Sequence, residues 1–449
     1  MNTLYGQSQW TFSELFQVYT HLGLSSKHFI FPLLLVYFIV LPVSHSIPCA
    51  YQNDIVNMKH PDVEVVLLPD QDMHNDFEVM GRPLNKIEDP SFDKWAAMKK
   101  PLKGFFAKIS NNPIYFGEEE SVILSDRSQA LATQSCSGPV LEKCTHGRTP
   151  LPSENVNTQY SDKEVIVIGP VMWGENFFHT VLDELLDLTL LVEVIKSNPS
   201  LSIVMERKHS DKGTRHVIDI IQSLDFWYNE SKGFERPRIN VFIIDGQPTQ
   251  FRTIYVASGG NCGIAQQLRC RNFQKLIPYH NLPAFPPNAS DVWAPQKEAT
   301  PRQGIIAYMS RRDGNRNFHN ETAVIEVLRE VFPTRTVIAV HPSIQWQTKI
   351  SILIGIMQNA ALIVSPHGSG LANLIFARAG THVLEFMPSH MYSWSNFNLC
   401  FNHMASGLRM PYWMMPLPGN HISFSQDPSA EDLRELLQQI DSWSSFQRL

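Results

Sequence analysis

Short apolar runs alternate with longer helical patterns in two parts of the chain. The first part predicts strands and helices in this order: strand 165–168, helix 175–196, strand 201–205, helix 216–226, strands 239–244 and 253–257. The second part predicts strand 305–309, helix 321–331, strand 336–340, helix 344–358, strands 361–364 and 382–386, and helix 429–443. Such alternation predicts a mostly parallel sheet covered on both faces. The sequence therefore predicts an α/β protein with two doubly wound, Rossmann-like domains.

A stretch rich in proline and polar residues, 278–301, separates the two parts. We place the N-terminal domain at 161–290 and the C-terminal domain at 300–449. Residues 49–160 are irregular in pattern, with many Pro, Asn and Asp, and we interpret them as a stem with N-terminal decoration. Two doubly wound domains that face a cleft bind ligands at the carboxyl ends of their strands.

The apolar run 361–364 leads into a turn with two glycines, Gly368 and Gly370, between His367, Ser369 and the start of a helix. Glycine lets the backbone turn sharply and approach a ligand closely, and a helix N-terminus attracts anions. The anion usual at such a place is a diphosphate. Glu385 follows on the next predicted strand, where an acid can hold a ribose hydroxyl. A purely structural turn is the alternative interpretation.

Arg311 and Arg312 follow the predicted strand 305–309 directly. Arginine can clamp phosphate oxygens with two parallel hydrogen bonds. The pair would therefore lie where a doubly wound domain binds phosphate. The alternative is a surface basic patch paired with Asp313.

A polar stripe marks the otherwise apolar helical pattern 175–196. It consists of Asn176, His179, Asp183 and Asp187, which fall within a narrow wedge at 100° per residue. Asp183 lies four residues after His179, so either side chain can act as a general base oriented by the other. The alternative is an ordinary amphipathic helix with a solvated face.

The N-terminal region determines the expected compartment. No Asp, Glu, Lys or Arg occurs between His28 and Asn53, and residues 29–43 are apolar. With its flanks the segment can span a bilayer, which needs about 20 residues. We expect an uncleaved signal anchor at 28–48 behind a cytoplasmic tail at 1–27. A cleaved signal peptide is the alternative.

Other features agree with a luminal chain. Glycosylation sequons begin at Asn229, Asn288 and Asn320. Two cysteine pairs with equal spacing, Cys136 with Cys144 and Cys262 with Cys270, could form disulfides in an oxidising lumen; the alternative is buried thiols. The six cysteines form no C-x-x-C pair, which argues against a zinc cluster. The net charge of −6 without a basic block argues against nucleic acid as a partner.

Three segments resemble glycosyltransferase family 61. They are residues 176–183 with the pattern N-x-x-H-x-x-x-D, Ser310-Arg311-Arg312 with Asn320-Glu321 downstream, and 367–373 ahead of Glu385. In the last segment the family usually shows H-G-A-G-L-T, and this chain has Ser369 and Ala372 instead. The resemblance covers roughly residues 160 to 420. Asp70 and Asp72 resemble the metal-binding D-x-D motif of another glycosyltransferase class. We reject that interpretation because no nucleotide-binding half-domain precedes them.

The resemblance implies a GT-B fold, inversion at the anomeric carbon and a type II membrane protein of the secretory pathway. We expect transfer of GlcNAc or xylose from a UDP-sugar to a glycan or glycoprotein hydroxyl, without a metal cofactor. Golgi membrane is the expected location, and the endoplasmic reticulum is the alternative. The expected catalytic residues are Asp183 and His179, and the expected donor-binding residues are Arg311, Arg312, His367, Gly368, Ser369, Gly370 and Glu385. The competing function is a catalytically inactive luminal binding protein with the same fold.

Overall fold

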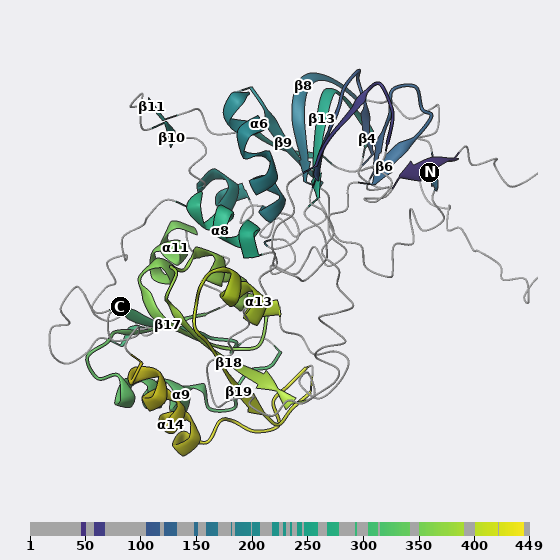
Figure 1. Ribbon diagram of the computed structural model, residues 1–449. Helices are drawn as coiled ribbons and strands as arrows, with labels where there is room; N and C mark the ends of the chain where they lie inside the picture. The colour runs from purple at the N-terminus through teal and green to yellow at the C-terminus, as the bar shows by residue number, and fades with distance from the viewer. Residues whose placement is uncertain are drawn as a thin grey trace, which may run out of the picture.

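A computed structural model describes the following parts of the chain: 46–50, 58–67, 105–116, 121–132, 148–150, 159–168, 181, 185–198, 200–206, 218–223, 228–229, 234–235, 240–244, 247–258, 267–277, 292–293, 304–312, 315–341, 350–389, 400–420 and 422–443. They form two large sheets with helices between and around them, which confirms a mixed α/β fold (Figure 1). A separate two-stranded sheet consists of β10 (Tyr228–Asn229) and β11 (Phe234–Glu235). No helix within these parts is long and apolar enough to cross a membrane. Residues 28–45 of the expected anchor lie outside them.

The N-terminal sheet is built on four neighbouring parallel strands in the order β12-β9-β8-β13. Their bounds are Gln159–Ile168 for β8, Ser202–Glu206 for β9, Asn240–Ile244 for β12 and Thr249–Ser258 for β13. All four were predicted from apolar runs. Figure 1 shows β8 and β13 side by side at the centre of this sheet.

The stretch expected to be a stem contributes seven further strands to the same sheet. They are β1 (Ser46–Ala50), β2 (Val63–Leu67), β3 (Phe105–Ile109), β4 (Ile114–Phe116), β5 (Ser121–Ile123), β6 (Ala130–Ala132) and β7 (Arg148–Pro150). Most of these strands pair antiparallel, and β3 and β4 follow one another along the edge of β13. Strands of three to five residues are too short to show a clear hydrophobic period. The sequence pattern therefore missed them.

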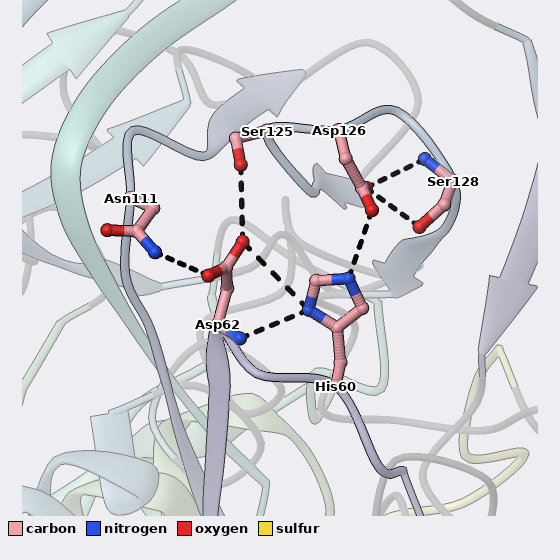
Figure 2. A network of polar contacts seen from close by, with 6 residues as sticks. All are labelled: His60, Asp62, Asn111, Ser125, Asp126 and Ser128. Carbon is pink, nitrogen blue, oxygen red and sulfur yellow. Dashed lines mark hydrogen bonds and ion pairs between the residues drawn. The ribbon is translucent and has the colours of Figure 1, made fainter.

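A network of polar side chains ties together three loops at one edge of this extension (Figure 2). Asp62, just before β2, accepts hydrogen bonds from Asn111 Nδ2 after β3 and from Ser125 Oγ after β5, the latter at 3.3 Å. Its backbone N–H donates to His60 Nδ1 at 3.2 Å. Since Nδ1 accepts, Nε2 carries the proton and donates to Asp126 Oδ2 at 3.2 Å. These contacts join the three loops to one another.

The C-terminal sheet has the strand order β14-β16-β15-β17-β18-β19, and β14 alone of these strands runs antiparallel to its neighbour. The bounds are Val292–Trp293 for β14, Ile305–Met309 for β15, Val337–Val340 for β16, Ala360–Pro366 for β17, His382–Pro388 for β18 and Tyr412–Leu417 for β19. The predicted strands correspond to β15, β16, β17 and β18. Strands β14 and β19 were not predicted.

Helices cover both faces of the C-terminal sheet (Figure 1). One face carries α9 (Glu321–Val331) and α14 (Ala430–Asp441); the other carries α11 (Ile350–Gln358), the 3-10 helix η6 (Ser369–Phe376) and α13 (Cys400–Gly407). Strand β15 shows why. Its Ile306 and Tyr308 pack in the cluster of α9 and α14, and Ile305, Ala307 and Met309 pack in the other cluster. The strand is buried on both faces, as its continuous apolar run predicts.

Helix α8 (Gln267–Lys275) lies between the two sheets (Figure 1). It packs against η6 and α13 on one side and against the 3-10 helix η4 (Leu185–Leu191) on the other. Cys270 and Phe273 are fully buried there, and Gln274 Nε2 donates to the carbonyl oxygen of Ala377. The two halves of the chain thus share one continuous apolar cluster.

The described part of residues 175–196 differs from the single helix that the pattern predicts. Residues 185–191 form η4, and α6 (Val192–Ser197) follows. A 3-10 helix has three residues per turn, so the wedge drawn at 100° per residue does not hold for Asp187. Asp187 is buried in η4, whereas Asn176, His179 and Asp183 lie outside the described residues.

The described residues include only some of the cysteines and sequon asparagines that the sequence analysis selected. Cys270 and Cys400 are buried, but Cys136, Cys144 and Cys262 lie outside the described residues, so both disulfide pairings stay predictions. Of the sequon asparagines, Asn320 is exposed and caps α9 by accepting a hydrogen bond from the Ala323 N–H at 3.2 Å. The rejected Asp70 and Asp72 lie outside the described residues.

Candidate functional site

The C-terminal sheet has a topological switch point between β15 and β17. From β15 the chain passes through α9 to β16 on one side, and from β16 through α11 to β17 on the other side. Open α/β sheets bind ligands at such a point, at the carboxyl ends of the two strands. The segments that follow them here are 310–312 and 367–370. Strand order therefore brings together the two segments that the sequence selected for anion binding.

The Arg311 guanidinium lies against the backbone of the turn 367–370, which we call the glycine turn. Its Nη1 donates to the carbonyl oxygen of His367 at 3.3 Å, and its Nε donates to that of Asn315 at 2.8 Å. A Cβ on Gly368 would lie 1.3 Å from Arg311 Nη1. Glycine is required at this position because a side chain approaches the backbone so closely. Arg311 is thereby fixed between two loops.

Glu321, in the first turn of α9, holds the loop that carries Arg311. Its carboxylate is buried and accepts from Ser310 Oγ at 2.9 Å and from the Arg311 N–H at 3.3 Å. Arg312 Nε lies 3.5 Å from the same carboxylate, and the Arg312 side chain is 58% exposed. The two neighbouring arginines therefore have different surroundings. Arg311 lies on the glycine turn, and Arg312 pairs with Glu321.

The helix that the sequence predicted after the glycine turn is η6. The Leu371 N–H donates to the Gly368 carbonyl oxygen at 2.9 Å, and Asn373 Nδ2 donates to that of Gly370 at 2.8 Å. Ser369 and Gly370 at its start are half-buried. The first N–H groups of a helix have no partner within it and carry its positive end. The start of η6 and the Arg311 guanidinium thus present positive charge at the same place.

His367 is held by a buried carboxylate. Its Nδ1 pairs with Glu385 on β18, and the Tyr412 hydroxyl on β19 donates to the other oxygen of that carboxylate. Because a carboxylate only accepts, His367 Nδ1 carries the proton. Burial, together with the charge of Glu385, raises the pKa of Tyr412 well above its usual value, so the hydroxyl stays protonated. Glu385 has no exposed surface and orients His367; a contact with a ribose hydroxyl stays a prediction.

The structure adds one arginine that the sequence analysis did not select. Arg316 is half-buried and has a left-handed backbone with φ of 63°, and its N–H donates to the Ile422 carbonyl oxygen at 2.7 Å. Burial lowers its pKa, and the negative charge of Glu385 opposes that effect. Burial, and then the charge of Arg316, lowers the pKa of Arg311 to about 10. Arg316 is a third arginine in a polar turn, and no other feature of the sequence marks it.

Of the expected catalytic residues, Asp183 and His179 both lie outside the described part of the chain. Within the described ranges, no group of three or more His, Cys, Asp or Glu side chains could hold a metal ion.

Comparison with known families identifies this region. The model of the family described as Glycosyltransferase 61 matches residues 163–384, about half of the chain. The matched segment begins within β8 and ends within β18, so it contains Arg311, Arg316 and the glycine turn. A search of curated proteins found no match.

The Glu321 contacts lead to a stability prediction. Glu321→Ala removes the acceptor for Ser310 and the Arg311 N–H, and we expect the free energy of unfolding to fall by about 2 kcal/mol. Thermal and urea denaturation measure the loss. The matched control is Glu330→Ala on the same helix, whose carboxylate pairs with Arg434 at 2.8 Å on the surface and should matter little. Equal stability of both variants would contradict the assigned role of Glu321.

Proposed function

Because the chain belongs to glycosyltransferase family 61, we propose that it transfers GlcNAc or xylose from a UDP-sugar to a hydroxyl of a glycan or glycoprotein, with inversion at the anomeric carbon. Family membership supports glycosyltransferase activity in general. The donor, the acceptor and the stereochemistry are our proposal.

The observation that carries the proposal is the Arg311 guanidinium fixed on the glycine turn at the switch point. The departing group of a UDP-sugar is a diphosphate, and its developing charge needs positive groups already in place. Arg311 and the leading amides of η6 are such groups. They are fixed before any ligand arrives, because Glu321 holds one loop and Glu385 the other through His367.

Inversion requires an acceptor hydroxyl that attacks the anomeric carbon from the face opposite the diphosphate. The hydroxyl loses its proton to a general base as the new glycosidic bond forms and the bond to the diphosphate breaks. We propose Asp183 for this base, with His179 as the alternative. In a GT-B arrangement this base would come from the N-terminal domain and the leaving-group contacts from the C-terminal domain. The two halves joined through α8 are compatible with this arrangement.

We further propose that transfer needs no metal ion. A divalent cation in a glycosyltransferase neutralises the leaving diphosphate. Arginine and helix amides at the glycine turn supply the same positive charge.

A donor screen tests the proposed function. Purified protein is assayed in EDTA with UDP-GlcNAc, UDP-xylose and UDP-arabinose against N-glycan, O-mannose and EGF-domain acceptors. We expect transfer from one donor. Arg311→Ala should weaken UDP binding by about 1.5–3 kcal/mol in calorimetry, the value of a charged hydrogen bond. Protein that binds UDP-sugars without transferring from any of them would instead support an inactive binding protein. Activity restored only by manganese would contradict the metal-free mechanism.

The general base has its own test. Asp183→Asn keeps the shape of the side chain and removes the base, so we expect turnover to fall about 100-fold or more. UDP affinity should stay near that of the unaltered protein, because the leaving-group contacts lie in the other domain. An active Asp183→Asn together with an inactive His179→Ala would exchange the two roles. Activity in both variants would remove this helix from the chemistry.

We propose a single-pass Golgi membrane protein of type II, with an anchor that begins at 28 and the luminal part after it; the endoplasmic reticulum is the alternative. The anchor expected at 28–48 must end before Ser46, because residues 46–48 belong to strand β1. The uncharged apolar segment and the downstream sequons support this topology. N-glycosidase treatment of membranes should shift the mass of the protein, and sealed vesicles should protect its C-terminal part from protease. An unchanged mass together with protease sensitivity would exclude this topology.

A further inference from the structure

We propose that Arg316 is the second arginine of the donor-diphosphate site, in the role that the sequence pattern assigns to Arg312. The inference rests on the proposed function, which supplies the diphosphate. It names a binding residue beside the Arg311 contact, because Arg311 Nε donates to the carbonyl oxygen of Asn315, the residue directly before Arg316, at 2.8 Å.

Arg312 is committed to a different contact. Its Nε lies 3.5 Å from the Glu321 carboxylate, and its N–H donates to Ser310 Oγ at 3.3 Å. More than half of its side chain is exposed. Both arginines lie beyond the end of β15. Arg311 contacts the glycine turn, whereas Arg312 contacts the Glu321 carboxylate.

The backbone of Arg316, next to the Asn315 carbonyl that Arg311 contacts, has an unusual conformation. Its φ of 63° lies in the left-handed region, which is uncommon for residues other than glycine, asparagine and aspartate. The hydrogen bond from its N–H to the Ile422 carbonyl oxygen pins this conformation to a distant segment. Two other arginines with positive φ, Arg127 and Arg409, are exposed, whereas Arg316 is half-buried. Strained backbone conformations that the surrounding structure holds in place are found mainly at functional sites.

The balance of charge indicates an anionic ligand. Arg311 and Arg316 are both partly withdrawn from water and lie close enough for the charge of one to lower the pKa of the other. The charged groups that act on Arg316 and Arg311 are these two arginines themselves and Glu385, and the titratable thiol of Cys400 lies nearby as well. Both oxygens of Glu385 already accept hydrogen bonds from His367 and Tyr412. A diphosphate would offset the repulsion between the arginines and gain charged hydrogen bonds from both.

A structural role is the competing explanation, in which Arg316 only balances the buried charge of Glu385. The two explanations predict different changes in the affinities of UDP and uridine. Substitution of a residue that binds phosphate weakens the binding of UDP and leaves the affinity for uridine unchanged. Substitution of a residue that only supports the fold lowers the stability of the protein and changes the affinities of UDP and uridine to the same extent.

The test measures the affinities of UDP and uridine by calorimetry for the full chain and its variants. Arg316→Gln keeps a polar side chain of similar length, and Arg316→Asn places a residue that tolerates the left-handed backbone. We expect both variants to bind UDP about 10- to 100-fold more weakly, with uridine affinity unchanged. Arg316→Asn should melt at or above the temperature of the unaltered protein, because the backbone strain is relieved.

The matched control is Arg409→Gln. Arg409 has the same left-handed backbone, with φ of 58°, but it is exposed and precedes β19, at the amino ends of the parallel strands, whereas the site lies at their carboxyl ends. Its substitution should change neither affinity. Unchanged UDP affinity in folded Arg316 variants, or equal losses for UDP and uridine, would overturn the inference. In either case UDP binding by the unaltered chain leaves the proposed function intact. Absence of UDP binding by the unaltered chain would overturn both.

Discussion

The contact between the Arg311 guanidinium and the glycine turn is the constraint on which the rest of the site depends. It requires a glycine at 368, because a Cβ there would overlap the guanidinium. It also requires that β15 and β17 be neighbours, since each contributes one partner. The Glu321 carboxylate holds the loop on the β15 side. A positively charged side chain is therefore packed onto backbone at the point where the strand order reverses, which is where open α/β sheets bind ligands.

A buried carboxylate forms the second layer of the site. Burying a charge is costly unless hydrogen bonds compensate for it. Glu385 obtains them from His367 and Tyr412, and the positive charge of Arg316 lies nearby. Glu385 on β18 thus joins the turn after β17, which carries His367, to β19, which carries Tyr412. The ring of His367 also contacts Phe401 at a centroid distance of 5.3 Å, which connects the polar network to the apolar cluster shared with α8.

The sequence predicted most of the central strands and the helices α9 and α14, because residues buried on both faces give long apolar runs and amphipathic helices give a clear period. It missed the seven strands of residues 46–150, whose short runs carry no period. It also predicted one helix for 175–196, where the described part has η4 and then α6. Hydrophobic spacing cannot distinguish a 3-10 helix from an α-helix over one or two turns.

For the site, the sequence by itself determined the chemistry: arginines after a strand, two glycines before a helix and an acid on the next strand. Those features are local, because a turn and a strand end each lie within a few residues. The tertiary structure alone decided which arginine lies beside Arg311 and where Glu385 points. Arg316 depends on a left-handed turn pinned by Ile422, and Glu385 depends on Tyr412 from the next strand. Contacts between segments far apart in the chain fix both, and no local pattern records them.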